Sequence, residues 1–279
     1  MNRVFLDLGF IKIYWYSIMI LTGALLGIFL VYKEFKRLKF DTKGLDNMAF
    51  YTIIFGLLGA RVWYVLFNLS EYKDNLLEIF AVWNGGLAIH GAIFAGLTFL
   101  YFYCKKKDIH FLKIADIVMP AVLIGQIVGR WGNFFNQEAH GGEVTRAFLE
   151  KICIPDFVIK GMFIRGKYYH PTFFYESIFN LLLLIFIVIF RRYKKVKEGM
   201  IFSIYLMGYG ILRFFIESMR TDSLMLGSIR VAQAVSIAFF ICGLVLMIVS
   251  IKKHDDYNKI EEKEETKKKK TTKKSKKVK

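Results

Sequence analysis

Cysteine is scarce in this chain, and the three cysteines that occur are far apart. Cys104, Cys153 and Cys242 form no C-x-x-C pair and have no histidine at a metal-binding spacing. This pattern excludes a disulfide framework and a zinc site built on cysteine. We expect no metal and no other cofactor.

Several catalytic and nucleotide-binding signatures are also missing. The sequence holds no Walker loop, no dinucleotide-binding glycine fingerprint, no H-E-x-x-H and no G-x-S-x-G. Nucleotide-driven transport, hydride transfer and serine acyl transfer therefore have no support. The formal charge is +17, but no nucleic-acid-binding signature accompanies it, so we expect no nucleic-acid partner. The charge fits orientation in a membrane and attraction to anionic lipid.

Apolar residues make up 55% of the 279 residues and are gathered in blocks. The blocks are about 17–25 residues long, which is enough to cross a hydrocarbon core of about 30 Å. This pattern predicts an all-α, polytopic membrane protein. Seven spans are predicted, at residues 14–32, 48–68, 79–103, 115–135, 173–190, 200–217 and 230–250.

The loops between the spans predict the orientation. Segments 33–39, 105–113 and 191–197 each carry at least four Lys or Arg, whereas 69–78 carries only Lys73. By the positive-inside rule the three basic loops are cytoplasmic, the N-terminus is outside and the C-terminus is inside. An odd number of spans agrees with this orientation.

Residues 1–251 form the predicted membrane domain. Its external loop at about 137–172 is unusually long, which is typical of functional loops; a small extracellular cap is the alternative. Residues 252–279 hold 13 Lys and 6 acidic residues without apolar periodicity. We expect a disordered cytoplasmic tail there that contacts the inner leaflet or has no role.

The segment from Gly129 to Glu138 reads G-R-W-G-N-F-F-N-Q-E and directly follows an apolar run. Ionisable groups at membrane depth cost about 2.5–3.5 kcal/mol each on insertion scales, so they indicate function. Arg130 offers a planar fork that suits two phosphate oxygens. The alternative is an arginine that snorkels to the membrane interface. Such an arginine would not need Asn133, Asn136 and Glu138 in the next two turns. We interpret the segment as part of a site for an anionic lipid headgroup.

A second polar cluster lies on the span at 200–217. Tyr209, Arg213 and Glu217 are four residues apart and Arg220 follows one turn later, so all four share one helix face. This face is expected to look into a polar cavity. The alternative is an ion pair between Arg213 and Glu217 that only orders the bundle.

Other polar residues in the spans are less specific. His90 is a candidate for proton transfer, a role that imidazole side chains often have, but a structural histidine is as compatible with its position. Tyr16 is compatible with interfacial anchoring. Arg61 is a buried guanidinium and Glu176 fits a helix cap; neither is assigned a chemical step.

The main motif resembles the signature of the bacterial phosphatidylglycerol–prolipoprotein diacylglyceryl transferases. The matching pattern is Gly129-Arg130-x-Gly132-Asn133-Phe134-x-Asn136-x-Glu138-x-x-Gly141. The likeness covers nearly the whole membrane portion and includes Trp15-Tyr16, Gly85 to His90, His170-Pro171, Tyr175-Glu176 and Tyr209 through Arg220. The chain departs from the family pattern at Asn84, where an aspartate is usual, and at Ala232, where a glycine is usual.

The resemblance implies an alkyl transfer in the bacterial cytoplasmic membrane. The lipobox cysteine thiol of a prolipoprotein signal peptide attacks the phosphate-bearing glycerol carbon of phosphatidylglycerol. A thioether forms and glycerol 1-phosphate leaves. A seven-helix fold with the N-terminus outside is also implied.

From the demands of this reaction we hypothesise roles for single residues. Arg130 and Arg213 clamp the phosphodiester, and Glu138 and Glu217 hold these arginines. His90 is the candidate base; electrostatic activation of the thiol without a base is the alternative. The substrate-binding residues expected besides Arg130 are Tyr16, Asn133, Asn136, Glu138, Tyr209, Glu217 and Arg220.

Two other classes of protein remain alternatives. A transporter or channel for an anionic solute would use buried arginines for translocation and predicts an internal repeat. The sequence holds only a short echo, Gly59-Ala60-Arg61-Val62 against Gly129-Arg130. A non-catalytic lipid-binding scaffold would not need His90 and Glu138 beside the arginines. We favour the transferase.

Overall fold

The computed structural model describes residues 3–9, 12–40, 42–73, 75–82 and 85–259. The chain divides into two compact units. The first unit comprises Met1–Glu34 and Ala115–Lys279, and the second comprises Phe35–Ile114. Asn84, one of the two departures from the family pattern, lies outside the described residues.

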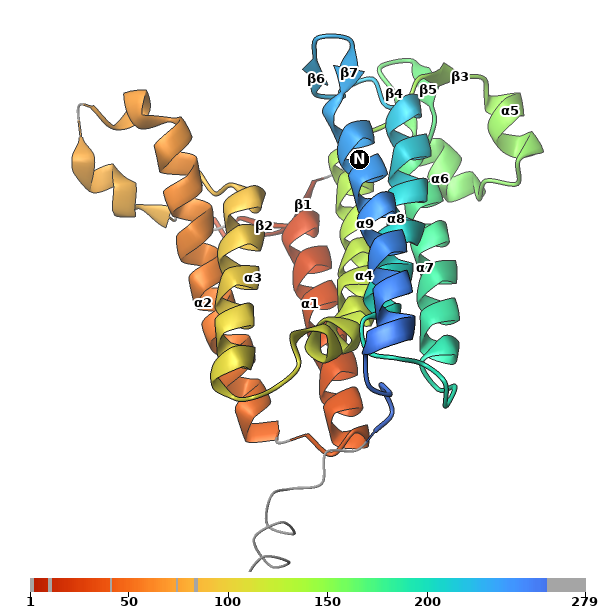
Figure 1. The fold of residues 1–279 in the computed structure, drawn as a ribbon. Coiled ribbons are helices and arrows are strands. Elements are labelled where there is room, and N and C mark those ends of the chain that lie inside the picture. Colours follow the sequence, from red (N-terminus) through yellow and green to blue (C-terminus); the bar gives the residue numbers. More distant parts are fainter. Residues whose placement is uncertain (1–2, 10–11, 41, 74, 83–84, 260–279) are drawn as a thin grey trace, which may run out of the picture. The chain divides into compact units, whose positions relative to one another are not determined.

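The first unit is built from long helices (Figure 1). The helices are α1 (Trp15–Arg37), α4 (Phe111–Asn136), α7 (Thr172–Phe190), α8 (Met200–Met219) and α9 (Val231–Lys253). A hairpin of β1 (Val4–Asp7) and β2 (Lys12–Tyr14) precedes α1, and a hairpin of β6 (Met225–Leu226) and β7 (Ile229–Arg230) joins α8 to α9. Helix α8 packs along both α7 and α9.

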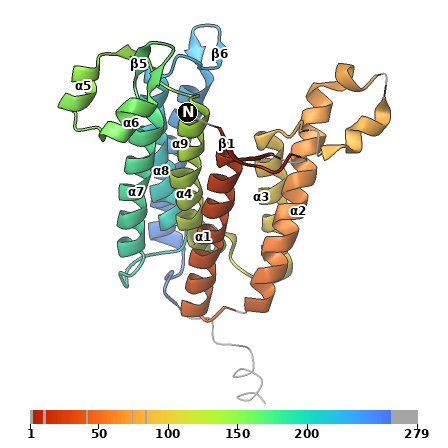
Figure 2. The ribbon, with the colours of Figure 1, turned by 180° about the vertical axis from the view of Figure 1, so that it is seen from behind.

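The second unit is a pair of packed helices with a loop between them (Figure 2). Helix α2 (Thr42–Phe67) is followed by two short 3-10 helices, η1 (Leu69–Tyr72) and η2 (Leu76–Phe80), and then by α3 (Ile89–Lys106).

Within the residues that the structure describes, six helices are long and apolar enough to cross a membrane: α1, α2 over Asp46–Phe67, α4, α7, α8 and α9. The prediction of an all-α, polytopic membrane protein is therefore confirmed. The span predicted at residues 79–103 differs, because its helix begins only at Ile89 and has 18 residues. Gly85 and Gly86 have φ of 86° and 70°, a left-handed backbone that no helix continues through.

Small residues and one buried carboxylate bring the helices of the first unit together. A Cβ added at Gly23 of α1 would lie 3.2 Å from the Cα of Gly125 on α4, so the two backbones approach closely there. The carboxylate of Asp116 on α4 accepts hydrogen bonds from the backbone N–H of Gly199 and Phe202, at 2.6 and 2.7 Å. These bonds satisfy N–H groups that the start of α8 would otherwise leave unpaired.

The long loop predicted between α4 and α7 is a folded cap, which we define as residues 137–171. It contains β3 (Glu143–Val144), α5 (Arg146–Lys151), α6 (Asp156–Gly161), β4 (Phe163–Ile164) and β5 (Lys167–Tyr169). The strands form an antiparallel sheet in the order β3-β5-β4. Buried side chains of α5 and α6 pack on Phe134 and Phe173, so the helix ends supply part of the core of the cap.

The C-terminal boundary differs from the prediction. Residues 252–259, expected to belong to a disordered tail, complete α9 and then fold back along the loop before α8. The buried Tyr257 donates a 2.7 Å hydrogen bond to the Glu34 carboxylate and a 2.8 Å backbone bond to the Val196 carbonyl. One buried aromatic residue therefore orders a segment of high charge. Residues 260–279 lie outside the described residues.

His170 fastens the cap to the start of α7. Its backbone exchanges hydrogen bonds with Gly141 and Gly142, both 3.0 Å long, and its Nδ1 lies 3.2 Å from the Tyr175 hydroxyl. Burial lowers the pKa of His170 from its ordinary value. The folded cap therefore prefers the neutral imidazole.

We predict that this fastening weakens in mild acid. Because the pKa of His170 is lower in the folded than in the unfolded chain, its contribution to stability is present above about pH 6.5 and is lost as the pH falls through the folded value. The measurement is amide exchange of Gly141 and of residue 170, whose N–H groups form the two backbone bonds, at pH 7 and pH 5, corrected for intrinsic rates. Protection should fall in the native chain and stay constant in a His170→Gln variant. Equal protection of the native chain at both values would contradict the prediction.

Candidate active site

The centre of the candidate site is a carboxylate shared by two arginines. Glu176, in the second turn of α7, is only 1% exposed. Its Oε1 lies 2.7 Å from Nη2 of Arg130 on α4, and its Oε2 lies 3.6 Å from Nη1 of Arg213 on α8. One side chain therefore links three helices through charge.

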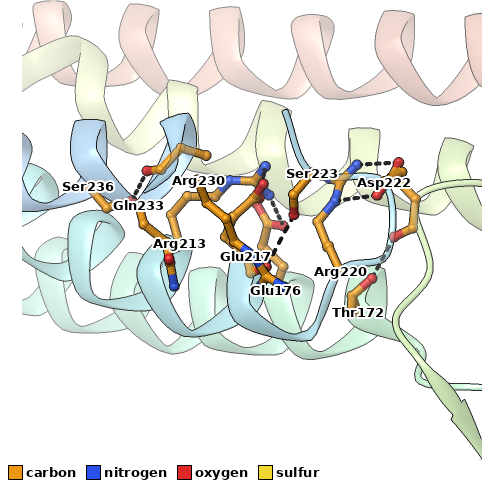
Figure 3. Close-up of polar contacts among 12 residues, drawn as sticks. Thr172, Glu176, Arg213, Glu217, Arg220, Asp222, Ser223, Arg230, Gln233 and Ser236 are labelled. Carbon is orange, nitrogen blue, oxygen red and sulfur yellow. Dashed lines mark hydrogen bonds and ion pairs between the residues drawn. The ribbon is translucent and has the colours of Figure 1, made fainter. Parts of the chain in front are cut away.

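A second buried carboxylate pairs with Arg213 from the same helix (Figure 3). Oε2 of Glu217 lies 2.7 Å from Nη2 of Arg213, so the i, i+4 ion pair that the spacing offered as an alternative is present. Arg230, at the start of α9, donates a hydrogen bond to the backbone carbonyl of Glu217. Helix α9 is thus tied to the same network.

The network leaves the arginines able to meet an anion. The side chains of Arg130 and Arg213 are 23% and 18% exposed, whereas those of the two carboxylates are 2–3% exposed. Each guanidinium carries five N–H donors, more than the carboxylates occupy. Two guanidinium groups held rigidly in this way suit the bidentate binding of phosphate oxygens.

Tyr209 joins the site one turn before Arg213 on α8. It interacts with Arg130, and its ring is stacked on Tyr205 with centroids 5.7 Å apart. The Tyr205 hydroxyl in turn accepts a 2.9 Å hydrogen bond from Gln126 of α4. The predicted face of α8 therefore lies against the polar residues of α4.

The end of α4 explains where Glu138 points. Gln137 has a left-handed φ of 53°, and the N–H groups of Gln137 and Glu138 bond back to the carbonyls of Phe134 and Asn133. This is a Schellman-type helix end, and it folds Glu138 back over the last turn. The Glu138 carboxylate then accepts hydrogen bonds of 3.1 Å from both Asn133 and Asn136.

Of the two carboxylates expected to hold the arginines, Glu217 does so. Glu138 instead organises the two asparagines, because the left-handed turn directs it along its own helix. The carboxylate that holds Arg130 is Glu176. Glu176 does not cap α7, whose N-cap residue is Pro171. The signal in the sequence was a carboxylate at the start of an apolar span, because a carboxylate in such a place requires a cationic partner.

Tyr16 and Arg220 lie at two further places in the first unit. Tyr16 packs on α4 at Gly132, where an added Cβ would lie 2.5 Å from the ring. Arg220, just after α8, forms two hydrogen bonds of 2.9 and 2.7 Å with Asp222 (Figure 3). These bonds lower the pKa of Asp222. Sequence reasoning missed Asp222, because it gave no reason to pair a loop aspartate with Arg220.

The last part of the motif is held between the cap and the end of α8. Gly141 pairs through its backbone with Arg220, and an added Cβ would lie 2.7 Å from His170 Cβ. The hydroxyl of Thr172 donates a 2.6 Å hydrogen bond to the Ala139 carbonyl (Figure 3). Only glycine fits at position 141 without displacing these neighbours.

His90 belongs to the second unit. It lies in the first turn of α3, between Ala88, whose N–H bonds to the Ala60 carbonyl at 3.0 Å, and Gly91, which packs on Gly59 of α2. Its position is thus fixed by α2. In the part of the chain that the structure describes, no three His, Cys, Asp or Glu side chains are placed to hold a metal ion.

Fold and site together define a polytopic membrane protein with a buried network of arginines and carboxylates suited to an anionic group. The family model for prolipoprotein diacylglyceryl transferase matches residues 3–249. A phosphatidylglycerol–prolipoprotein diacylglyceryl transferase of Staphylococcus saprophyticus is 45% identical over 250 residues, 89% of each chain. An enzyme of the same name from Clostridium botulinum is 44% identical over 257 residues, 92% of this chain and all of the relative. The chain belongs to the prolipoprotein diacylglyceryl transferase family.

We predict that Glu176→Gln destabilises the first unit. The substitution keeps the shape but leaves two largely buried guanidinium groups with one carboxylate, and breaking a buried ion pair costs about 3–5 kcal/mol. The measurement is thermal unfolding in detergent. Glu150→Gln is the control, because the pair of Glu150 with Arg146 is exposed, and solvent screening leaves such a pair little effect on stability. Equal effects of the two variants would contradict the central place of Glu176.

Proposed function

We propose that this protein transfers the diacylglyceryl group of phosphatidylglycerol to the lipobox cysteine thiol of prolipoproteins. Sulfur bonds to the glycerol carbon, the bond from that carbon to the phosphate oxygen breaks, and glycerol 1-phosphate leaves with the electron pair. Family membership supports this reaction. The observation in the structure that carries it is the network in which Glu176 holds Arg130 and Arg213.

The leaving phosphate sets the main electrostatic demand. A phosphodiester carries one negative charge, and breaking its carbon–oxygen bond places a second charge on the released phosphate. We assign the stabilisation of this charge to Arg130 and Arg213, since preorganised donors in a site of low polarity stabilise developing charge most. Asn133 and Tyr16 are assigned to the phosphate oxygens or glycerol hydroxyls. Asn136, Tyr209 and Arg220 complete the proposed substrate-binding set.

The thiol must lose its proton to attack. A free cysteine has a pKa of about 8.5, so at neutral pH most of it is the weaker nucleophile. We assign the base to His90, whose imidazole suits proton transfer near neutrality. Glu138 contributes indirectly, by fixing Asn133 and Asn136.

We place the protein in the bacterial cytoplasmic membrane with seven spans, the N-terminus outside and the C-terminus inside. The basic loops 33–39, 105–113 and 191–197 support this orientation. Helix α3 is proposed as the seventh span, since it ends in Lys105 and Lys106, which suit the cytoplasmic interface.

The first test is a mass measurement. Purified protein in detergent micelles containing phosphatidylglycerol receives a synthetic peptide with a signal helix and a lipobox cysteine. We expect the peptide to gain the mass of one diacylglyceryl group, and a peptide with serine in place of the cysteine to gain nothing. No gain over several peptides, with the protein still folded, would overturn the transferase assignment.

The second test is Arg130→Lys. Lysine keeps the charge but loses the fork that binds Glu176 and two phosphate oxygens at once, so we expect kcat to fall about 100-fold or more, as for the loss of a transition-state donor. Arg146→Lys, in an exposed cluster of the cap, is the matched control and should keep its activity. Near-normal turnover by Arg130→Lys would refute the clamp.

A further inference from the structure

Arg61 is a buried arginine outside the network described above. It lies on α2 and is 7% exposed. Its Nε donates to the carbonyl of Ile79 at 2.7 Å, and its Nη1 donates to the carbonyls of Gly85 and Gly86 at 2.8 and 3.0 Å. Its Nη2 donates to the Glu78 carbonyl. One guanidinium thus binds backbone carbonyls of η2 and of the segment that leads from η2 to α3.

The geometry of these bonds requires a planar fork. The four carbonyls approach three different nitrogens of the guanidinium, and the ring of Tyr72 lies 5.4 Å from its centre. A lysine ammonium is a single point with three donors and reaches fewer of them. The guanidinium also requires glycine at position 86, because a Cβ added there would lie 2.5 Å from Nη1 of Arg61.

The same part of α2 holds the chain on both sides of His90. Arg61 binds Gly85 and Gly86, the Ala60 carbonyl accepts from the N–H of Ala88 at 3.0 Å, and Gly59 packs on Gly91, where an added Cβ would lie 2.2 Å from the Gly59 carbonyl oxygen. Three consecutive residues of α2 therefore contact successive points of the segment from 85 to 91. His90 is the titratable residue within that segment.

We propose that Arg61 is a positioning residue that sets the place of the His90 imidazole for the transfer reaction. It acts through the backbone of Gly85 and Gly86 and does not touch the substrate. A cavity of about 190 Å³ beside it is lined by Tyr64, Glu71 and Tyr72, so the fork lies at the edge of open space and not in a tightly packed core. The proposal rests on the assignment of His90 as the base.

The test is a double-mutant cycle on the full chain in phosphatidylglycerol micelles with the lipobox peptide. Arg61→Lys should lower kcat about 30-fold with KM for the peptide within about twofold, since backbone displacements of about 1 Å cost catalysis more than binding. In a His90→Ala background the same substitution should change the residual rate less than about twofold. Glu71→Gln, a change in the wall of the same cavity, should keep the rate of the native chain.

The cycle separates a positioning role from a merely structural one. Loss of folded protein would lower the rate by the same factor with and without His90, and that result would overturn the proposal. An unchanged kcat in Arg61→Lys would also overturn it. If Arg61→Lys does not fold, Gly86→Ala takes its place, because it displaces the fork while keeping Arg61.

The assignment of His90 is tested separately in the same experiment. Partial recovery of His90→Ala by added imidazole supports the base. A normal rate in His90→Ala removes the base assignment and this proposal together, but leaves the transferase activity and the arginine clamp standing.

Discussion

The structure of the first unit depends on a buried carboxylate that two arginines share. Glu176, Arg130 and Arg213 come from α7, α4 and α8, and none of these side chains is stable in hydrocarbon without a partner. Their pairing therefore fixes which faces of the three helices meet. Glu217 extends the network along α8, and Arg230 extends it to α9. The interactions that make the site are the ones that select the helix packing.

A clamp for a phosphate has to satisfy two opposing requirements. The guanidinium groups must be held in one geometry, and they must keep donors for the ligand. The buried carboxylates hold the guanidinium groups in place and so meet the first requirement. The partial exposure of Arg130 and Arg213 meets the second. Because Glu176 divides its two oxygens between two arginines, neither guanidinium receives a complete bidentate partner. A phosphate with several oxygens offers each arginine the contacts that the shared carboxylate does not.

Sequence reasoning reached the helical membrane fold, the motif from Arg130 to Glu138 and the pair of Arg213 with Glu217, because spacing along one helix determines these features. It could not pair Arg130 with Glu176, because contacts between helices depend on the packing. It placed the start of α3 ten residues too early, since a composition window does not register the left-handed φ of Gly85 and Gly86. It also missed the ordered segment around Tyr257, because one buried aromatic ring outweighed the charged composition around it.

Arg61 and Arg130, which lie in similar short stretches of the sequence, differ in their partners. Arg61 is surrounded by backbone carbonyls, which orient a chain segment but carry no net charge to balance a ligand. Arg130 faces a carboxylate, and its side chain is partly exposed. An internal repeat, as a transporter of anions would have, predicts equivalent surroundings at the two positions. The unequal surroundings instead support the proposed roles of Arg61 in organising a loop and of Arg130 in binding an anion.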